Sequence, residues 1–215
     1  MSQHHLSGLD AVLFDLDGTL WDSTVGVAAS WTRGLQRLAP GLREPITDLE
    51  FRSCMGLRIP DIGAKLFPML RGECRERLIK ACLEEEEEWL RSAGGVVYDG
   101  VEDTLAALSR DYSLGLVSNC QQGYIENFFR LTGLGRFFND HESYGATGLR
   151  KADNLRLVVE RNNFKRACYV GDMHIDRDAA AGAGLPFVYC RYGFGDLPDC
   201  QYNIDCFSQL LDILR

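Results

Sequence analysis

Two patterns of apolar and polar positions divide the chain. The short apolar run Ala11–Phe14 ends in a polar, glycine-containing turn, which predicts a buried strand. From about residue 23 to residue 91 apolar positions recur instead at helical spacing, and no convincing strand interrupts them. The expected helices cover residues 25–38, 47–56, 59–70 and 72–92, the second of them capped by Thr47 with Glu50 three residues later.

Beyond residue 96 strands and helices are expected to alternate. Predicted helices lie near residues 101–110, 123–131, 154–161, 176–183 and 206–214, and predicted strands at 113–117, 137–138, 167–170 and 186–190. Strands separated by helices of this length predict an α/β fold with a parallel sheet covered on both faces. The preceding helical stretch is therefore an insertion after the first strand.

Composition narrows the class of protein. A chain of 215 residues with 46% hydrophobic content suits one domain, or a core with a smaller insert. The formal net charge of −8 argues against nucleic acid as a partner. The eight cysteines form no C-x-x-C pair, so we expect reduced thiols and a cytoplasmic location. We see no signal peptide or membrane span, and expect a monomer or weak dimer.

Polar residues follow three of the predicted strands. They are Asp15, Asp17, Gly18 and Thr19 after the first, Ser118 and Asn119 after the second, and Asp172 and Asp176 after the strand at 167–170. Ligands collect at the carboxyl ends of parallel strands, so these side chains are expected to converge.

Several carboxylates at one point repel each other unless a cation neutralises them. Oxygen ligands suit Mg²⁺, which is commonly shared with a substrate phosphate. We expect Asp15 and Asp172 to supply carboxylate oxygens and Asp17 its backbone carbonyl. Asp176 would bind the metal directly or orient a ligand water.

The same residues indicate phosphoryl transfer. Asp15 is the expected nucleophile, forming an aspartyl-phosphate, while Asp17 protonates the leaving oxygen and later takes a proton from water. Thr19, Ser118, Asn119 and the backbone at Gly18 are candidate phosphate donors. Lys151 is the candidate cation, because it precedes a helix that leads into the strand before Asp172.

The chain resembles the haloacid dehalogenase-like hydrolase superfamily, in the branch of phosphoglycolate phosphatase and β-phosphoglucomutase. Phe14-Asp-Leu-Asp-Gly-Thr-Leu is similar to its first motif, Val117-Ser-Asn to the second, Lys151 to the third and Gly171-Asp-Met-His-Ile-Asp to the fourth. Ala152 stands where this branch often has proline. The resemblance implies a Rossmann-like core at residues 1–21 and 95–215 and a helical cap at 22–94.

The expected function is a Mg²⁺-dependent phosphatase for a small phosphate monoester, such as a phosphoglycolate-, sugar- or nucleotide-like one. A sugar phosphomutase and a catalytically weak phosphate-binding module are the alternatives. Arg58 is a cap candidate for binding a substrate carboxylate or second phosphate, with a surface arginine as the alternative. Trp21 is a candidate at the cap hinge, with core packing as the alternative. The acidic run at residues 84–88 predicts a solvated helix face.

Overall fold

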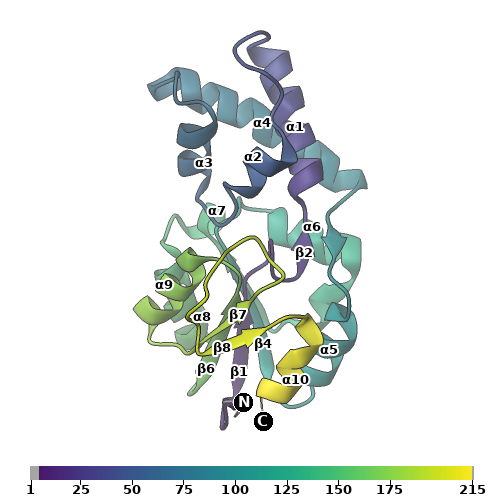
Figure 1. Ribbon diagram of the computed structural model, residues 1–215, viewed down its shortest axis with the longest axis vertical. Coiled ribbons are helices and arrows are strands. Elements are labelled where there is room, and N and C mark those ends of the chain that lie inside the picture. The colour runs from purple at the N-terminus through teal and green to yellow at the C-terminus, as the bar shows by residue number, and fades with distance from the viewer. Residues whose placement is uncertain (1–4, 215) are drawn as a thin grey trace.

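A parallel sheet forms the centre of the computed structural model, which describes residues 5–214 (Figure 1). Its strand order is β5-β4-β1-β6-β7-β8, and every neighbouring pair is parallel. The strands are β1 (Ala11–Phe14), β4 (Ser113–Ser118), β5 (Asp140–Ser143), β6 (Ala167–Gly171), β7 (Phe187–Cys190) and β8 (Tyr202–Ile204).

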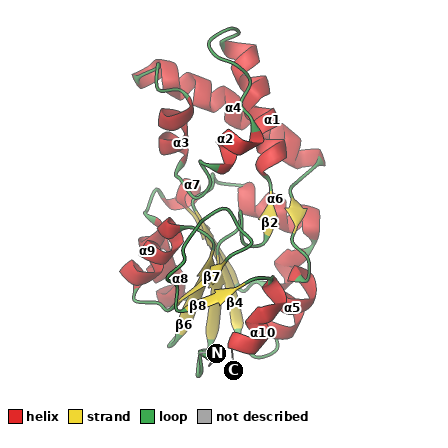
Figure 2. Ribbon diagram, in the orientation of Figure 1, coloured by secondary structure: helices red, strands yellow, loops and turns green. Residues whose placement is uncertain are grey.

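Helices cover both faces of the sheet and form a separate layer beyond its carboxyl ends (Figure 2). In the upper layer lie α1 (Thr24–Leu38), α2 (Asp48–Arg52), α3 (Ile59–Leu66) and α4 (Gly72–Ser92). Around the sheet lie α5 (Val101–Leu108), α6 (Tyr124–Thr132), α7 (Tyr144–Thr147), α8 (Lys151–Arg161), α9 (His174–Ala183) and α10 (Leu210–Ile213), with the 3₁₀ turns η1 (Leu134–Phe137) and η2 (Phe207–Gln209).

The alternation of side chains along β1 explains the two covered faces. Val12 and Phe14 belong to the apolar cluster shared with α5, α6 and α10, whereas Leu13 belongs to the cluster shared with α8 and α9. Because successive strand residues point to opposite faces, a fully apolar strand needs helices on both sides. The predicted α/β fold with a parallel, Rossmann-like sheet is confirmed.

The helical layer α1–α4 has an apolar core of its own. Trp31 is fully buried there, stacked on Phe67 and edge-on to Phe51. The chain enters this layer through β2 (Trp21–Asp22) and returns through β3 (Val96–Val97), which pair antiparallel. The helical cap is therefore inserted after the first strand, as expected. Cap boundaries at 22 and 94 stay a prediction, and residues 1–4 and 215 of the assigned core lie outside the described residues.

The predicted strand at Phe137 and Phe138 is wrong. Phe137 closes η1, and the edge strand begins at Asp140. Phe138 packs edge-on against Phe14, so its apolar character reflects a loop anchored on the core. The strand itself reads Asp-His-Glu-Ser and carries no apolar signal, because an edge strand tolerates polar side chains.

Other element ends also differ from the predictions. Thr47 forms the expected capping box with Glu50, but that helix ends at Arg52. Helix α3 ends at Leu66, since Pro68 follows and cannot continue the hydrogen-bond ladder. The expected C-terminal helix divides into η2 and α10, and the short strand β8 carried no sequence signal that we recognised.

All eight cysteines lie within the described residues and are free thiols. Within residues 5–214, no helix combines the length and apolar content needed to cross a bilayer.

The close packing of α1 on α4 depends on Gly34. A Cβ at this position would lie 2.5 Å from the Cα of Cys82 on α4. We expect Gly34→Ala to lower the free energy of unfolding by about 1–3 kcal/mol, because the overlap outweighs the gain in helix propensity. Urea unfolding measures this. Gly182→Ala on α9, whose Cβ would lie 3.2 Å from the Cβ of Ala152, serves as the control with a smaller effect. An unchanged urea midpoint for Gly34→Ala would contradict the packing.

Candidate active site

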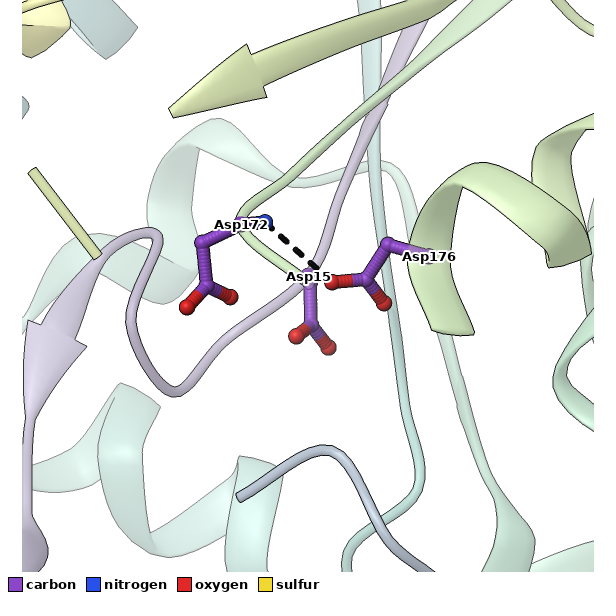
Figure 3. A group of neighbouring side chains, drawn as sticks. All are labelled: Asp15, Asp172 and Asp176. Carbon is purple, nitrogen blue, oxygen red and sulfur yellow. Dashed lines mark hydrogen bonds between the residues drawn. The ribbon is translucent and has the colours of Figure 1, made fainter. Parts of the chain in front are cut away.

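Three aspartates meet at the carboxyl end of the sheet. Asp15 follows β1, Asp172 follows β6, and Asp176 reaches toward both from the first turn of α9 (Figure 3). One carboxylate oxygen of each lies within 4.8 Å of the others, and all three side chains are buried. Strands β1 and β6 are neighbours in the sheet, which is why residues more than 150 positions apart in sequence come together.

Lys151 brings a buried positive charge into this cluster. Its Nζ donates to Asp15 Oδ1 at 2.9 Å and to Asp176 Oδ1 at 2.7 Å. Burial alone would lower the pKa of Lys151, but the two carboxylates outweigh it and hold the pKa above its usual value. Burial raises the pKa of Asp15 to about 7, with a further rise from Asp176 and an opposing effect of Lys151. The lysine compensates one negative charge of the cluster and leaves the others.

Asp172 retains an unused acceptor. Its Oδ2 accepts from the backbone N–H of Phe194 at 2.6 Å, while Oδ1 is buried without a hydrogen-bond partner. Burial, followed by the charges of Asp176 and Asp15, raises the pKa of Asp172 well above its usual value. A buried carboxylate oxygen without a donor, facing two further carboxylates, fits a divalent cation with oxygen ligands such as Mg²⁺.

The turn at Gly18 leaves room for Asp172. Gly18 has a φ of +85°, and a Cβ there would lie 2.2 Å from Asp172 Oδ2. Only glycine meets both conditions without strain, which is the physical reason for the Asp-Gly pair in the first turn.

Both oxygens of Asp176 already have partners. Oδ1 accepts from Lys151, and Oδ2 accepts from the backbone N–H groups of Asp172 and Met173, at 3.2 and 2.9 Å, which caps α9. These bonds fix the turn after β6 and so orient Asp172. They also leave Asp176 less free than Asp172 to bind a cation directly.

Asp17 is oriented by donors to one of its oxygens. Trp21 Nε1 lies 2.9 Å and Ser23 Oγ 2.6 Å from Oδ1, and the Tyr124 hydroxyl lies 3.0 Å from the same atom. None of these bonds involves Oδ2. Burial raises the pKa of Asp17 despite the three donors, so its carboxyl group holds a proton more readily than an exposed aspartate. That proton would sit on Oδ2, since Oδ1 is occupied.

The candidate phosphate donors differ in placement. Ser118 and Asn119 line a cavity beside Asp15, and Asn119 Nδ2 donates to the cap carbonyl of Gly56 at 2.8 Å. Thr19 is fully buried, its Oγ1 has no hydrogen-bond partner, and it does not line that cavity. Ser118 and Asn119 therefore border the cavity, whereas Thr19 is buried outside its lining.

The cavity, of about 40 Å³, lies between the sheet end and the cap. Its cap wall is apolar, formed by Val27, Trp31, Phe51, Met55, Ile59 and Ile62 together with Leu57 and Gly56, and interrupted by one carboxyl group, Glu86. Glu86 is 3% exposed. The prediction of a solvated acidic face at residues 84–88 is therefore wrong for Glu86, although Glu84, Glu87 and Glu88 are exposed.

The two cap candidates lie outside the cavity lining. Arg58 pairs with Asp61 at 2.8 Å and lies over the ring of Tyr144, half exposed. Trp21 is fully buried, packs edge-on against Tyr124 and Phe128, and holds Asp17. Trp21 therefore packs in the apolar core, which was the alternative to a role at the cap hinge.

Sequence reasoning missed three residues that shape the site: Glu86, Tyr124 and Phe194. Glu86 shares the i, i+4 spacing of the buried residues Cys82 and Leu90, so helical register could have separated it from its exposed neighbours. Tyr124 and Phe194 act through contacts between segments far apart in the chain, for which the sequence carries no local signal.

A capped parallel sheet with buried aspartates and a lysine at its carboxyl end defines a phosphohydrolase-type active site. The chain belongs to the haloacid dehalogenase-like hydrolase family, whose family model matches residues 12–190. It is thus an enzyme of the phosphoric monoester hydrolase class.

Individual relatives agree with this placement. The chain is 30% identical over 197 residues to a phosphoglycolate phosphatase of Synechococcus elongatus, covering 87% of this chain and 86% of the relative. It is 28% identical over 186 residues to the pyrophosphatase PpaX of Bacillus velezensis, covering 81% and 79%. A predicted phosphoglycolate phosphatase structure from Haemophilus somnus has a TM-score of 0.84 at 21% identity, covering 99% of both chains, which shows the shared fold.

The repulsion among the carboxylates gives a prediction for Asp172→Asn. Because the pKa of Asp172 is raised in the folded protein, the metal-free protein loses stability as the pH rises from about 4 through the raised pKa. The variant lacks this loss. With chelator at alkaline pH, we expect its free energy of unfolding to exceed that of the wild type by about 1 kcal/mol in urea titrations.

The same variant should lose stabilisation by Mg²⁺, measured as the rise in Tm on adding the ion. Asp153→Asn, which removes an exposed carboxylate from α8, is the control and should keep the rise. If Asp172→Asn is less stable than the wild type in chelator, or if its Tm still rises on adding Mg²⁺, this account of the cluster is contradicted.

Proposed function

We propose that the protein is a Mg²⁺-dependent phosphatase that hydrolyses a small phosphate monoester through an aspartyl-phosphate on Asp15. The observation that carries this proposal is the pairing of a buried Asp15 with Lys151 beside the unpartnered Oδ1 of Asp172. This arrangement gives a nucleophile, a cation for phosphate oxygens and an oxygen ligand for a metal within one buried cluster.

Asp15, Asp172 and the backbone carbonyl of Asp17 would hold the ion, and Asp176 would orient Asp172. Bound Mg²⁺ supplies charge that offsets the repulsion between the nucleophilic carboxylate and the phosphate oxygens. Lys151 keeps Asp15 in place through its hydrogen bond. Its positive charge opposes the rise in the pKa of Asp15 and so favours the ionised carboxylate. Ser118, at the carboxyl end of β4, supports the proposal because it borders the same cavity and can donate to a phosphate oxygen.

Asp17 serves as acid and then as base. Its Oδ2 would protonate the oxygen of the leaving alcohol while Asp15 attacks phosphorus. The ionised Asp17 then takes a proton from the water that hydrolyses the aspartyl-phosphate. Its raised pKa supports the first step, and the donors on Oδ1 keep Oδ2 available for both.

Asp15→Asn should abolish hydrolysis across a panel of phosphate monoesters, because an amide cannot form the covalent intermediate; we expect a loss of about 10⁴-fold or more. Phosphate release with Mg²⁺ or chelator measures this, and intact-protein mass spectrometry of Asp17→Asn after mixing with substrate tests for one added phosphoryl group. Asp153→Asn serves as control. Activity that persists in chelator or in Asp15→Asn rejects the mechanism. Including sugar phosphates tests the mutase alternative, which requires isomer formation.

Tyr124→Phe should change the pH profile of kcat/KM. Removing a donor disfavours the ionised form of Asp17 and raises its pKa further, so the protonated acid persists to higher pH. The alkaline limb should therefore move upward by about half a unit to one unit. Tyr112→Phe, at the opposite end of β4, should leave the limb in place. A downward shift would contradict the role of Asp17 as the acid.

A further inference from the structure

The cap wall of the cavity contains a carboxyl group that has no role in the proposed reaction. Glu86 lies on α4, borders the cavity and is buried. Its Oε2 accepts from Trp31 Nε1 at 2.5 Å and its Oε1 accepts from Gln121 Nε2 at 2.8 Å. A carboxylate offers about four acceptor positions, so these two bonds fix its orientation and leave it able to accept more.

The surroundings of Glu86 do not supply a counter-charge. Among the described residues that line the cavity there is no lysine or arginine, and Asp15 and Asp17 lie on its sheet side. Burial raises the pKa of Glu86 to about 7, with a further rise from Asp17, which reflects the cost of a negative charge there. Lys151 lies behind Asp15, engaged with two carboxylates. An anionic leaving group would thus meet carboxyl groups and no cation in this wall.

Asn119 adds a second unused acceptor. Its Nδ2 donates to the carbonyl of Gly56, which fixes the orientation of the amide, and its Oδ1 is buried without a partner. A phosphate dianion has no proton to donate to either group. A donor on the rest of the substrate can instead serve the unpartnered Oδ1 of Asn119 and the free acceptor positions of Glu86.

We propose that the substrate is the phosphate ester of a small, partly apolar alcohol that carries a hydroxyl or ammonium donor and no second anionic group, with Glu86 as the specificity-determining residue. The apolar side chains around Glu86 contact the carbon skeleton, and Glu86 accepts from the donor. This inference rests on the proposed phosphatase function. It differs from the expectation that Arg58 binds a substrate carboxylate, because Arg58 pairs with Asp61 outside the cavity lining.

Four esters of similar size test the proposal: 2-hydroxyethyl phosphate, 2-aminoethyl phosphate, propyl phosphate and phosphoglycolate. They differ mainly in whether the far end of the alcohol is a neutral donor, a cationic donor, apolar or anionic. We expect kcat/KM for the two donor esters to exceed that for phosphoglycolate by about tenfold or more, with propyl phosphate in between. Phosphoglycolate turned over as well as the donor esters would overturn the proposal.

Glu86→Gln keeps the shape and removes the charge. We expect the ratio of kcat/KM for 2-aminoethyl phosphate over phosphoglycolate to fall by about tenfold in this variant. Glu87→Gln, the same change at an exposed neighbour on α4, is the control and should keep the wild-type ratio. An unchanged ratio in Glu86→Gln overturns the role of Glu86.

The outcomes separate the two levels of the proposal. Hydrolysis of the esters in the wrong order leaves the phosphatase function standing and rejects the specificity. Failure to hydrolyse any phosphate monoester, including the wider panel, rejects the phosphatase function and this inference with it. Should Glu86→Gln not fold, the order of the four esters on the wild-type protein still decides.

Discussion

The paired contacts of Lys151 with Asp15 and Asp176 are the interaction on which the site depends. Three buried carboxylates within 4.8 Å of one another would otherwise have to take up protons. If all three are ionised, one ammonium group leaves two negative charges, which is the charge that one divalent cation neutralises. The charge of the cluster is therefore only partly compensated, and under the proposed mechanism one divalent cation would complete the compensation. A second lysine would neutralise part of the remaining charge and so weaken the proposed metal site.

The order of the strands places this cluster, and the cap then closes over it. Because β4, β1 and β6 are adjacent, Ser118, Asp15 and Asp172 lie close together at the carboxyl end of the sheet. Contacts between cap and core lie around the same point: Glu86 accepts from Gln121, and the carbonyl of Gly56 accepts from Asn119. These contacts join residues that border the cavity. The position of the cap is therefore coupled to the groups that border the cavity.

The sequence predicted what short-range patterns encode. The apolar run before Asp15, the helical spacing of the cap and the alternation beyond residue 96 led to the fold class. The strand ends led to Asp15, Asp172 and Asp176, and the position of Lys151 before the helix that leads into the strand of Asp172 made it the candidate cation. Strand β5 was not predicted, because a polar edge strand lacks the apolar pattern of a buried one. The burial of Glu86 was not predicted, because the composition of an acidic run does not show which of its residues faces inward. Arg58 was a cap candidate, with a surface arginine as the alternative, and its pairing with Asp61 became evident only in the structure.

Two different parts of the molecule would determine the type of reaction and the choice of substrate. Under the proposed mechanism, the carboxylate cluster at the sheet end acts only on the phosphate group and places no demand on the alcohol that is released. In the same proposal, the wall contributed by α1–α4 would contact the rest of the substrate. The carboxyl-bearing member of that wall among the described lining residues is Glu86. Phosphoglycolate and pyrophosphate, named for two relatives, both carry an anionic group beyond the phosphate that is attacked. A buried carboxyl group is unsuited to such a group, since like charges at low dielectric repel strongly. Membership of the family therefore supports hydrolase chemistry for this protein, while the leaving group has to be inferred from Glu86 and the apolar residues around it.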